Sequence, residues 1–333
     1  MKSILNIIFF FLFAVTYTGY AQYSIVRHFT TADGLPSNMI YACVEDSKGF
    51  LWIATDNGLA RFDGKHFQVF TTEHGLPDNE VLQVVVEKNG RIWANCFNQS
   101  PAYFDEVENR FINEKQNPEL AKVKGNGVLL LSAMKEGGVL FMVAYNSSYV
   151  YFNGKHYALI KNNLNENLGQ FIKCLADGSV LFVDAGRDTS CHFYLVKNGV
   201  VLNYYSANNL RNMYAKCDLM KENLFLFSPL SNKLFVLRDF SGPKIQYSID
   251  SIIFKDPISN FGFGKDYISV VNKKAEIEFY HKTSLKHAFT LKGKYTPNSM
   301  YVDSKDNIWV TTIDKGLLLY DKKILSSINL PLA

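Results

Sequence analysis

The stretch that decides the fold reads GLPSNMIYACVEDSKGFLWIATDNGLARFD and runs from Gly34 to Asp63. It alternates short apolar runs with the turn-forming residues Gly, Asn and Asp. Residues 75–105 repeat this order as GLPDNEVLQVVVEKNGRIWANCFNQSPAYFD, and residues 303–321 repeat its second half as DSKDNIWVTTIDKGLLLYD. Internal repetition of this kind indicates a fold built from copies of one supersecondary unit.

Four fainter copies lie between these clear ones, and each is found by the apolar strand that follows a turn. One marker per copy gives the series Trp52, Trp93, Phe141, Phe182, Phe225, Ile268 and Trp309. Subtracting neighbouring positions gives spacings of 41, 48, 41, 43, 43 and 41 residues. Short strands at such a period are typical of a β-propeller, whereas helical repeats need longer amphipathic runs. The sequence therefore predicts an all-β, seven-bladed β-propeller in which the three Trp residues pack between blades.

The two ends of the repeat region predict how the ring closes. Residues 29–34 match residues 70–75 at a shift of 41 positions, so Ile25 to Thr30 corresponds to an outermost strand that no earlier strands precede. We expect this N-terminal strand to pair with the last blade around Leu317 to Tyr320. Such pairing would cover a strand edge that an open ring leaves exposed.

The first 21 residues have the features of a secretory signal peptide. Lys2 supplies a positive charge, Ile4 to Val15 is an apolar run, and the small residues Gly19 and Ala21 precede a cleavage position. A membrane anchor is the alternative, but twelve helical residues rise only about 18 Å, less than a bilayer core of about 30 Å. The predicted domains are therefore a signal peptide (1–21), the propeller (22–323), and a C-terminal tail or the start of a downstream region (324–333), in a periplasmic or extracellular location.

The composition excludes several classes of protein. The 333 residues are 47% hydrophobic with a formal net charge of +4, and no basic run exceeds two residues. A nucleic-acid partner is not expected, because such binding needs a concentrated basic face. The five Cys residues show no metal-binding spacing and are expected to be buried thiols. We expect no metal, no cofactor and no membrane span after the signal peptide.

The motif Gly-Leu-Pro-x-Asn, then Asp-x-x-Gly-x-Leu-Trp-Ile-x-Thr, then x-x-Gly-Leu-x-Arg-Phe-Asp resembles the two-component regulator propeller repeat of bacterial sensor proteins. Residues 34–63 match it closely, and residues 75–105 and 303–321 match it well. The resemblance implies a propeller outside the inner membrane, followed in most relatives by an immunoglobulin-like domain, a membrane span and a histidine kinase. These 333 residues contain neither span nor kinase, so the chain is expected to be the N-terminal part of a longer sensor or to act alone.

Candidate ligand-binding residues lie in loops expected at one mouth of the propeller. Polar side chains around a pre-formed cleft can bind a sugar or a peptide, and the candidates are Asn57, Asn95, Asn98, Tyr145, Asn146, Arg187 and Asp314. The alternative is a turn-forming role, because Asn and Asp side chains bond to their own backbone and tolerate the left-handed conformation.

The sequence favours a non-catalytic, extracytoplasmic sensor propeller of a two-component system that binds a small ligand such as a glycan fragment. A protein–protein scaffold is the second hypothesis, with a homodimer, a second propeller or a kinase region as partner. A propeller enzyme of the sialidase or lyase type is the third. Its expected signatures are poor, because the chain has no H-E-x-x-H, G-x-S-x-G or P-loop motif.

Overall fold

The computed structural model describes residues 27–321, with gaps at 124–128, 135–136, 144–146, 153–154, 162–170, 175–178, 185–189, 198–199, 209–213, 219–222, 228–231, 239–247, 264–265 and 293–294. The predicted signal peptide and C-terminal tail lie outside the described residues, and so do their boundaries.

Within the described residues the strands form seven four-stranded antiparallel sheets, which we number I to VII. Sheet I contains β2 (Ile40–Glu45), β3 (Leu51–Thr55), β4 (Gly58–Phe62) and β5 (Phe67–Phe70). Sheet II contains β6 (Val81–Val86), β7 (Ile92–Cys96), β8 (Ala102–Asp105) and β9 (Arg110–Ile112). Sheet III contains β10 (Leu129–Ala133), β11 (Val139–Val143), β12 (Ser147–Phe152) and β13 (Lys155–Lys161).

The remaining sheets repeat this order of consecutive strands, except that sheet VII takes its fourth strand from the start of the chain. Sheet IV contains β14 (Phe171–Cys174), β15 (Val180–Asp184), β16 (Ser190–Lys197) and β17 (Val200–Asn208). Sheet V contains β18 (Tyr214–Asp218), β19 (Asn223–Phe227), β20 (Lys233–Arg238) and β21 (Ser248–Ile253). Sheet VI contains β22 (Ile258–Phe263), β23 (Tyr267–Asn272), β24 (Glu276–His281) and β25 (His287–Lys292). Sheet VII contains β26 (Pro297–Val302), β27 (Ile308–Thr312), β28 (Leu317–Tyr320) and β1 (Arg27–Phe29).

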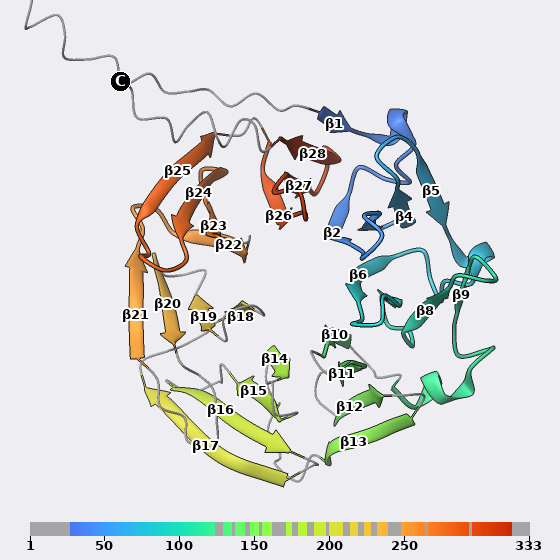
Figure 1. Cartoon of the computed structure of the whole chain (residues 1–333), viewed down its shortest axis with the longest axis horizontal. Helices are drawn as coiled ribbons and strands as arrows, with labels where there is room; N and C mark the ends of the chain where they lie inside the picture. Colours follow the sequence, from blue (N-terminus) through green and yellow to red (C-terminus); the bar gives the residue numbers. More distant parts are fainter. Residues whose placement is uncertain are drawn as a thin grey trace, which may run out of the picture.

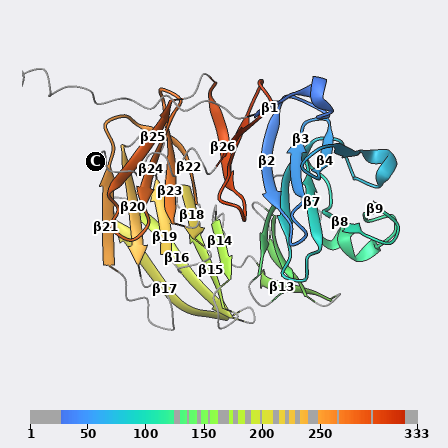
Figure 2. The same cartoon turned by 45° about the horizontal axis from the view of Figure 1, so that its top comes forward.

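The sheets are arranged around a common centre (Figure 1), and the turned view shows that the strands of neighbouring sheets stand side by side (Figure 2). The first strand of each sheet, from β2 to β26, lies nearest the centre. Each of the seven sequence markers falls in the second strand of a different sheet. The all-β prediction is confirmed, with only three short 3₁₀ turns, η1 (Thr31–Asp33), η2 (Thr72–His74) and η3 (Pro118–Val123), among the described residues.

Sheet VII joins the two ends of the described chain. Strand β1 pairs antiparallel with β28, with Arg27 opposite Leu319 and Phe29 opposite Leu317. These are the residues that the 41-residue shift predicted to pair. The ring of Phe29 is 2% exposed and packs 6.0 Å from the Trp309 ring, so an apolar contact supports the short backbone ladder.

The Trp markers pack between sheets, as the sequence predicted. The ring centroid of Trp52 lies 5.1 Å from that of Phe104 in sheet II, and the Trp93 centroid lies 5.3 Å from that of Phe141 in sheet III. Trp309 lies 6.0 Å from Phe62 in sheet I. Aromatic pairs at these distances contribute about 0.5–1.5 kcal/mol each beyond the area that they bury. The repeated Trp therefore holds sheet I against sheet II, sheet II against sheet III, and sheet VII against sheet I.

Candidate functional site

The Gly-Leu-Pro loops have a repeated local structure. Gly34 and Gly75 end the short turns η1 and η2 with φ of 102° and 91°, a backbone conformation that strains other residues. Four residues later, the Oδ1 of Asn38 accepts a hydrogen bond from Thr31 N at 3.0 Å, and Asn79 accepts one from Thr72 N at 2.9 Å. The Asn of the motif therefore closes its own loop.

The same loops also bind the turn of the preceding sheet. The backbone N of Gly316, in the β27–β28 turn, donates to Asn38 O at 2.9 Å. Gly58 N, at the start of β4, donates to Asn79 O at 2.6 Å. Each Gly-Leu-Pro loop is thus fixed to a neighbouring turn by main-chain bonds. We call the surface formed by loops 30–39 and 71–80 and turns 56–57, 97–101 and 313–316 the Gly-Leu-Pro face.

Three of the predicted site residues lie on the Gly-Leu-Pro face and are exposed: Asn57, Asn98 and Asp314. Asn57 Nδ2 donates to Pro36 O at 3.2 Å, which ties its turn to the adjacent loop. Asn98 has a φ of 52°, so it occupies the left-handed region that Asn tolerates. Asp314 forms an exposed ion pair with Lys315 at 3.1 Å. The first two residues therefore have turn-forming roles whether or not they bind a ligand.

The other predicted site residues are not on this face or are not described. Asn95 lies within strand β7 and is 2% exposed, so its predicted loop position is wrong. Strand β7 continues to Cys96, which corresponds to Thr55 at the end of β3, so the turn begins only at Phe97. Tyr145, Asn146 and Arg187 lie outside the described residues.

Two apolar residues on the Gly-Leu-Pro face were missed from the sequence. Phe97 and Ile313 are 52% and 53% exposed, although both are large apolar side chains. They occupy the turns that also carry Asn98 and Asp314. A mixture of exposed apolar and polar side chains on one face is typical of recognition surfaces. Their signal in the sequence is an apolar residue directly after the second strand, where the first repeat has Asp56.

The inner strands carry a repeated irregularity at the end nearest this face. The pairing register shifts around the second residue of β2, β6, β22 and β26, which leaves that residue unpaired as a β-bulge. Bulges re-aim side chains and occur often next to functional sites. The four bulged residues are Tyr41, Leu82, Ser259 and Asn298.

Tyr41 joins two sheets through its phenol group. Its OH donates to Glu80 Oε1 at 2.9 Å, and Glu80 directly precedes the first strand of sheet II. Burial raises the pKa of Tyr41 to about 12, and the Glu80 carboxylate and Asp56 add to the effect. The phenol is therefore neutral at physiological pH and acts as a hydrogen-bond donor.

Amide side chains make similar links between other inner strands. Asn298 Nδ2 donates to Ile40 O at 3.0 Å, which connects sheet VII to sheet I. Gln83 both donates to Leu131 O and accepts from Leu131 N, each at 2.9 Å, which connects sheet II to sheet III. Asn260 donates to Asn298 O, which connects sheet VI to sheet VII. These contacts fix the positions of the inner strands relative to one another.

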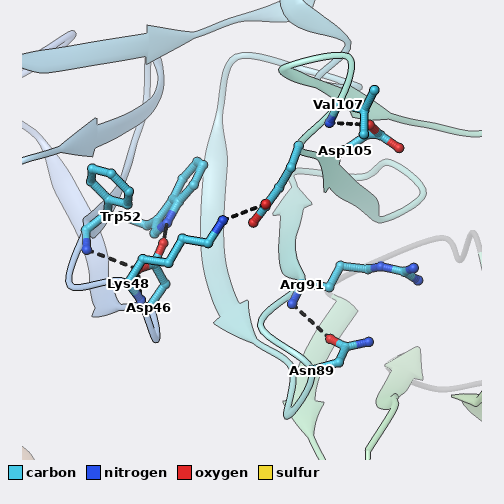
Figure 3. A network of polar contacts seen from close by, with 9 residues as sticks. Asp46, Lys48, Trp52, Asn89, Arg91, Asp105 and Val107 are labelled. Atoms are coloured by element: carbon cyan, nitrogen blue, oxygen red, sulfur yellow. Dashed lines mark hydrogen bonds and ion pairs between the residues drawn. The ribbon is translucent and has the colours of Figure 1, made fainter.

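The opposite ends of the sheets contain a second repeated contact. Trp52 Nε1 donates to Asp46 Oδ2 at 2.8 Å, and Trp309 Nε1 donates to Asp303 Oδ2 at 2.9 Å. In sheet II, Glu87 replaces the Asp and accepts from Trp93 Nε1 at 3.1 Å. Figure 3 shows this region, where Lys48 also reaches Glu106 of sheet II. The Asp-to-Trp spacing of the motif is therefore a structural requirement.

A cavity of about 560 Å³ lies at one end of sheet VI, and none of the described candidate residues lines it. It is lined by Asp266, Tyr267, His281, Lys282, Thr283 and Ser284. No motif in the sequence indicates this cavity. In the described part of the chain, no group of three His, Cys, Asp or Glu side chains could hold a metal ion.

Arginine side chains could mark an enzyme site of the sialidase type, so their positions matter. The guanidinium of Arg61 lies 5.0 Å from the Phe50 ring centroid, and that of Arg91 lies 4.8 Å from the Tyr103 ring centroid. Both therefore pack on aromatic rings within the sheets.

No helix in the described ranges is long and apolar enough to cross a membrane.

Comparison with known protein families agrees with the motif. Residues 34–57 match the family described as Two component regulator propeller. The matched segment is the first Gly-Leu-Pro loop with strands β2 and β3 and the following turn, so the resemblance drawn from the sequence is confirmed there. No curated protein matches the chain.

Solved structures with a similar fold include sensors and enzymes. The extracellular domain of the hybrid two component system BT3049 from B. thetaiotaomicron has 18% identity and a TM-score of 0.62, with 88% of this chain and 41% of that chain covered. The extracellular domain of BT4673 from the same organism, described as a one component system, has 14% identity and a TM-score of 0.65, with coverage of 91% and 43%. A catalytically inactive virginiamycin B lyase from Staphylococcus aureus has 12% identity and a TM-score of 0.64, with coverage of 88% and 97%.

These similarities establish the fold only. The chain spans about two fifths of the length of the two extracellular domains, and nearly the whole length of the lyase.

Proposed function

We propose that this chain is the extracytoplasmic recognition propeller of a two-component signal-transduction system. The observation that carries the proposal is the family match at residues 34–57, in a chain whose fold is also that of extracellular domains of such systems. The signal peptide predicted at residues 1–21 supports a location outside the cytoplasm. In this proposal the propeller binds a ligand and performs no chemistry.

The proposed architecture is a seven-bladed propeller closed by its first strand. Support comes from the seven four-stranded sheets and from the pairing of β1 with β28. Contacts between sheets VII and I add to it, because Ser304 N donates to Glu45 Oε2 at 2.6 Å and Asn298 Nδ2 donates to Ile40 O at 3.0 Å. A closed ring leaves no sheet without a neighbour on either side.

The proposed binding surface is the Gly-Leu-Pro face. Its loops are fixed by main-chain bonds to neighbouring turns, so the surface is formed before a ligand arrives and little ordering entropy is lost on binding. Phe97 and Ile313 offer apolar contact area beside the polar Asn98 and Asp314. Exposed apolar surface next to hydrogen-bonding groups suits the faces and hydroxyl groups of a sugar, so a glycan fragment is the proposed ligand class.

A thermal-shift screen of the purified chain against oligosaccharides tests this proposal. A ligand that binds only the folded state raises the Tm in proportion to its occupancy. We expect Phe97→Ala to reduce the ligand-induced shift without lowering the Tm of the free protein, because the side chain is half exposed. Val107→Ala is the matched control, since Val107 is 96% exposed in the turn at the other end of strand β8.

Two results would contradict the ligand proposal. One is the absence of any shift across the panel. The other is an equal response of Phe97→Ala and Val107→Ala to a ligand that does shift the parent protein, which would place the binding site elsewhere.

A lyase is the second candidate function, because this chain covers 97% of the S. aureus enzyme at a TM-score of 0.64. That structure contains Quinupristin, so Quinupristin is the first compound to test. Incubation with the purified chain, followed by liquid chromatography and tandem mass spectrometry, detects ring opening, because a ring opened by elimination keeps its mass but changes its retention time and fragment ions. An unchanged Quinupristin retention time and fragmentation pattern after prolonged incubation would count against this candidate.

A further inference from the structure

The outermost strands of the sheets differ in how well their free edges are protected. An edge strand has unpaired N–H and C=O groups, and proteins protect such edges by keeping the strands short or by placing charges on them. Strands β1, β5 and β9 contain only three or four residues. Strands β13 and β25 contain Lys, and β21 contains Asp250 at its third position.

Strand β17 has neither kind of protection. It contains nine residues, Val200–Asn208, which read VVLNYYSAN and include no charged residue and no Pro. It is the end strand of sheet IV. Leu202 in this strand is 49% exposed, although it is a large apolar residue.

A β-bulge limits the usable part of β17 to its second half. The register shifts between Leu195 and Val196 of β16, which leaves Leu202 as the extra residue. From Asn203 to Asn208 the pairing with β16 is regular over six residues. Strands β13 and β25 have corresponding register shifts that leave shorter regular runs. The run from 203 to 208 is therefore the longest regular, uncharged outer edge among the described strands.

We propose that residues 204–208 pair antiparallel with the same residues of a second copy of this chain, in a register that places Ser206 opposite its own copy. Antiparallel pairing of a strand with its own copy has twofold symmetry, so every open N–H can face a C=O of the other copy. It also places the central residue opposite its own copy, which is favourable only where that residue is uncharged, because like charges opposite each other are destabilising. Strand β21 would place Asp250 near its own copy, whereas β17 has no such conflict.

The paired strands join two copies of sheet IV into one continuous eight-stranded sheet. The Gly-Leu-Pro face is formed by residues of sheets VII, I and II, so both copies keep it open. The pairing is therefore independent of the proposed ligand function and can succeed or fail separately.

Analytical ultracentrifugation across a hundredfold range of protein concentration tests the proposal. We expect a monomer–dimer equilibrium for the parent chain. Ser206→Lys adds a charge in the centre of the run, at a position whose register partner is His192 rather than the buried Phe193. It should raise the dimer Kd at least tenfold. Ser251→Lys is the matched control on the exposed outer strand β21 and should leave the Kd unchanged.

A charge-reversed partner gives a further check. A mixture of Ser206→Lys and Ser206→Glu should dimerise more tightly than either variant alone, because opposite charges then lie across the pair. A parent chain that stays monomeric throughout would overturn the proposal, as would a Kd that Ser206→Lys leaves unchanged or that Ser251→Lys raises equally.

Hydrogen–deuterium exchange keeps the test independent of whether the variants fold. The amides of residues 204–208 in the parent chain should gain protection as concentration rises, whereas those of β21 should not. Equal exchange at low and high concentration would also overturn the proposal.

Discussion

The repeats at residues 34–70 and 75–112 have matching positions 41 residues apart, yet they make corresponding contacts with different side chains. In the first repeat, Asp46 accepts hydrogen bonds from its own turn, at Lys48 N and Phe50 N, and from Trp52 Nε1. In the second repeat, Glu87 occupies the position of Asp46 and accepts from Trp93 Nε1.

The longer Glu side chain reaches beyond its own turn to the next sheet. Glu87 Oε1 accepts from Gly138 N of the next sheet at 2.9 Å, while Asn89 takes over the turn by accepting from Arg91 N at 2.9 Å (Figure 3). In sheet I, the Asp46 carboxylate accepts all three of these hydrogen bonds. In sheet II, the turn bond is accepted by Asn89 and the Trp bond by Glu87, which also accepts a hydrogen bond from sheet III. A repeat motif therefore specifies a set of hydrogen bonds more strictly than it specifies residue types.

The two motif glycines offer the largest contrast between the repeats. A Cβ added at Gly75 would lie 1.9 Å from Phe111 O, whereas the nearest atom to one added at Gly34 is 3.7 Å away. We expect Gly34→Ala to lower the free energy of unfolding by about 1–2 kcal/mol, the cost of the left-handed backbone. Gly75→Ala should cost about 3 kcal/mol or more, because the backbone must also move. Urea unfolding measures both, and equal losses would show that the added methyl group meets no obstacle at Gly75.

Removing the two carboxylates should have the next largest effect. Glu87 is 7% exposed, so Glu87→Ala leaves the Trp93 indole N–H and Gly138 N buried without an acceptor. Each unsatisfied buried donor costs about 1–3 kcal/mol, so we expect a loss of about 2–4 kcal/mol in the free energy of unfolding.

Asp46→Ala should cost less, about 1–2 kcal/mol, because water can reach the turn amides that it leaves. Chemical unfolding of both variants, with Glu87→Gln as the isosteric control, measures this difference. A larger loss for Asp46→Ala than for Glu87→Ala would contradict the assigned bond to sheet III.

The repeats also differ in alkaline stability, because Tyr41 corresponds to Leu82. The pKa of Tyr41 is raised to about 12 in the folded protein, above its ordinary value of 10.0. Below pH 10 the phenol is neutral in both states, so its contribution to stability is complete. As pH rises from 10 to 12, the unfolded chain loses the proton first, and the free energy of unfolding falls. Tyr41→Leu should make this fall less steep, as measured by Tm against pH, and an unchanged slope would exclude Tyr41 as its source.

The smallest expected effect concerns the contact that joins the two repeats at the surface. Lys48 Nζ lies 2.5 Å from Glu106 Oε2, but both side chains are more than half exposed. Exposed ion pairs contribute about 0–1 kcal/mol and are screened by salt. We expect Lys48→Ala to change the free energy of unfolding by less than about 0.5 kcal/mol, with Lys65→Ala as an exposed control on the same face. A loss larger than that of Asp46→Ala would reverse the order proposed for this region.

Much of the fold could be predicted because its signals are local. Trp52, Trp93 and Trp309 recur at one position of the repeat, and each lies in the second strand of its sheet. The turn residues Asp, Asn and Gly set the strand ends, since their side chains and φ angles determine where a strand must stop. The pairing of β1 with β28 was predictable for the same reason, because Phe29 and Phe70 each precede a Thr-Thr-x-x-Gly turn.

The site was harder to predict because it depends on contacts between repeats. The hydrogen bond from Tyr41 to Glu80 joins residues 39 positions apart, and no property of either residue alone indicates it. Asn95 was placed in a loop because it is polar, although it corresponds to Ala54 within β3, and β7 ends at Cys96, the position of Thr55. Asn57 and Asn98 were recognised as turn residues, but the exposure of Phe97 and Ile313 becomes visible only in three dimensions.

Among the described strands, β1 is synthesised first and β28 last, and this order matters while the chain folds. Arg27 to Phe29 has no partner strand until Leu317 to Leu319 have been synthesised. Sheets I to VI need no residue beyond Lys292, whereas sheet VII needs both β1 and β28. A chain that stops before Leu317 would therefore leave the edge of β1 without its partner strand.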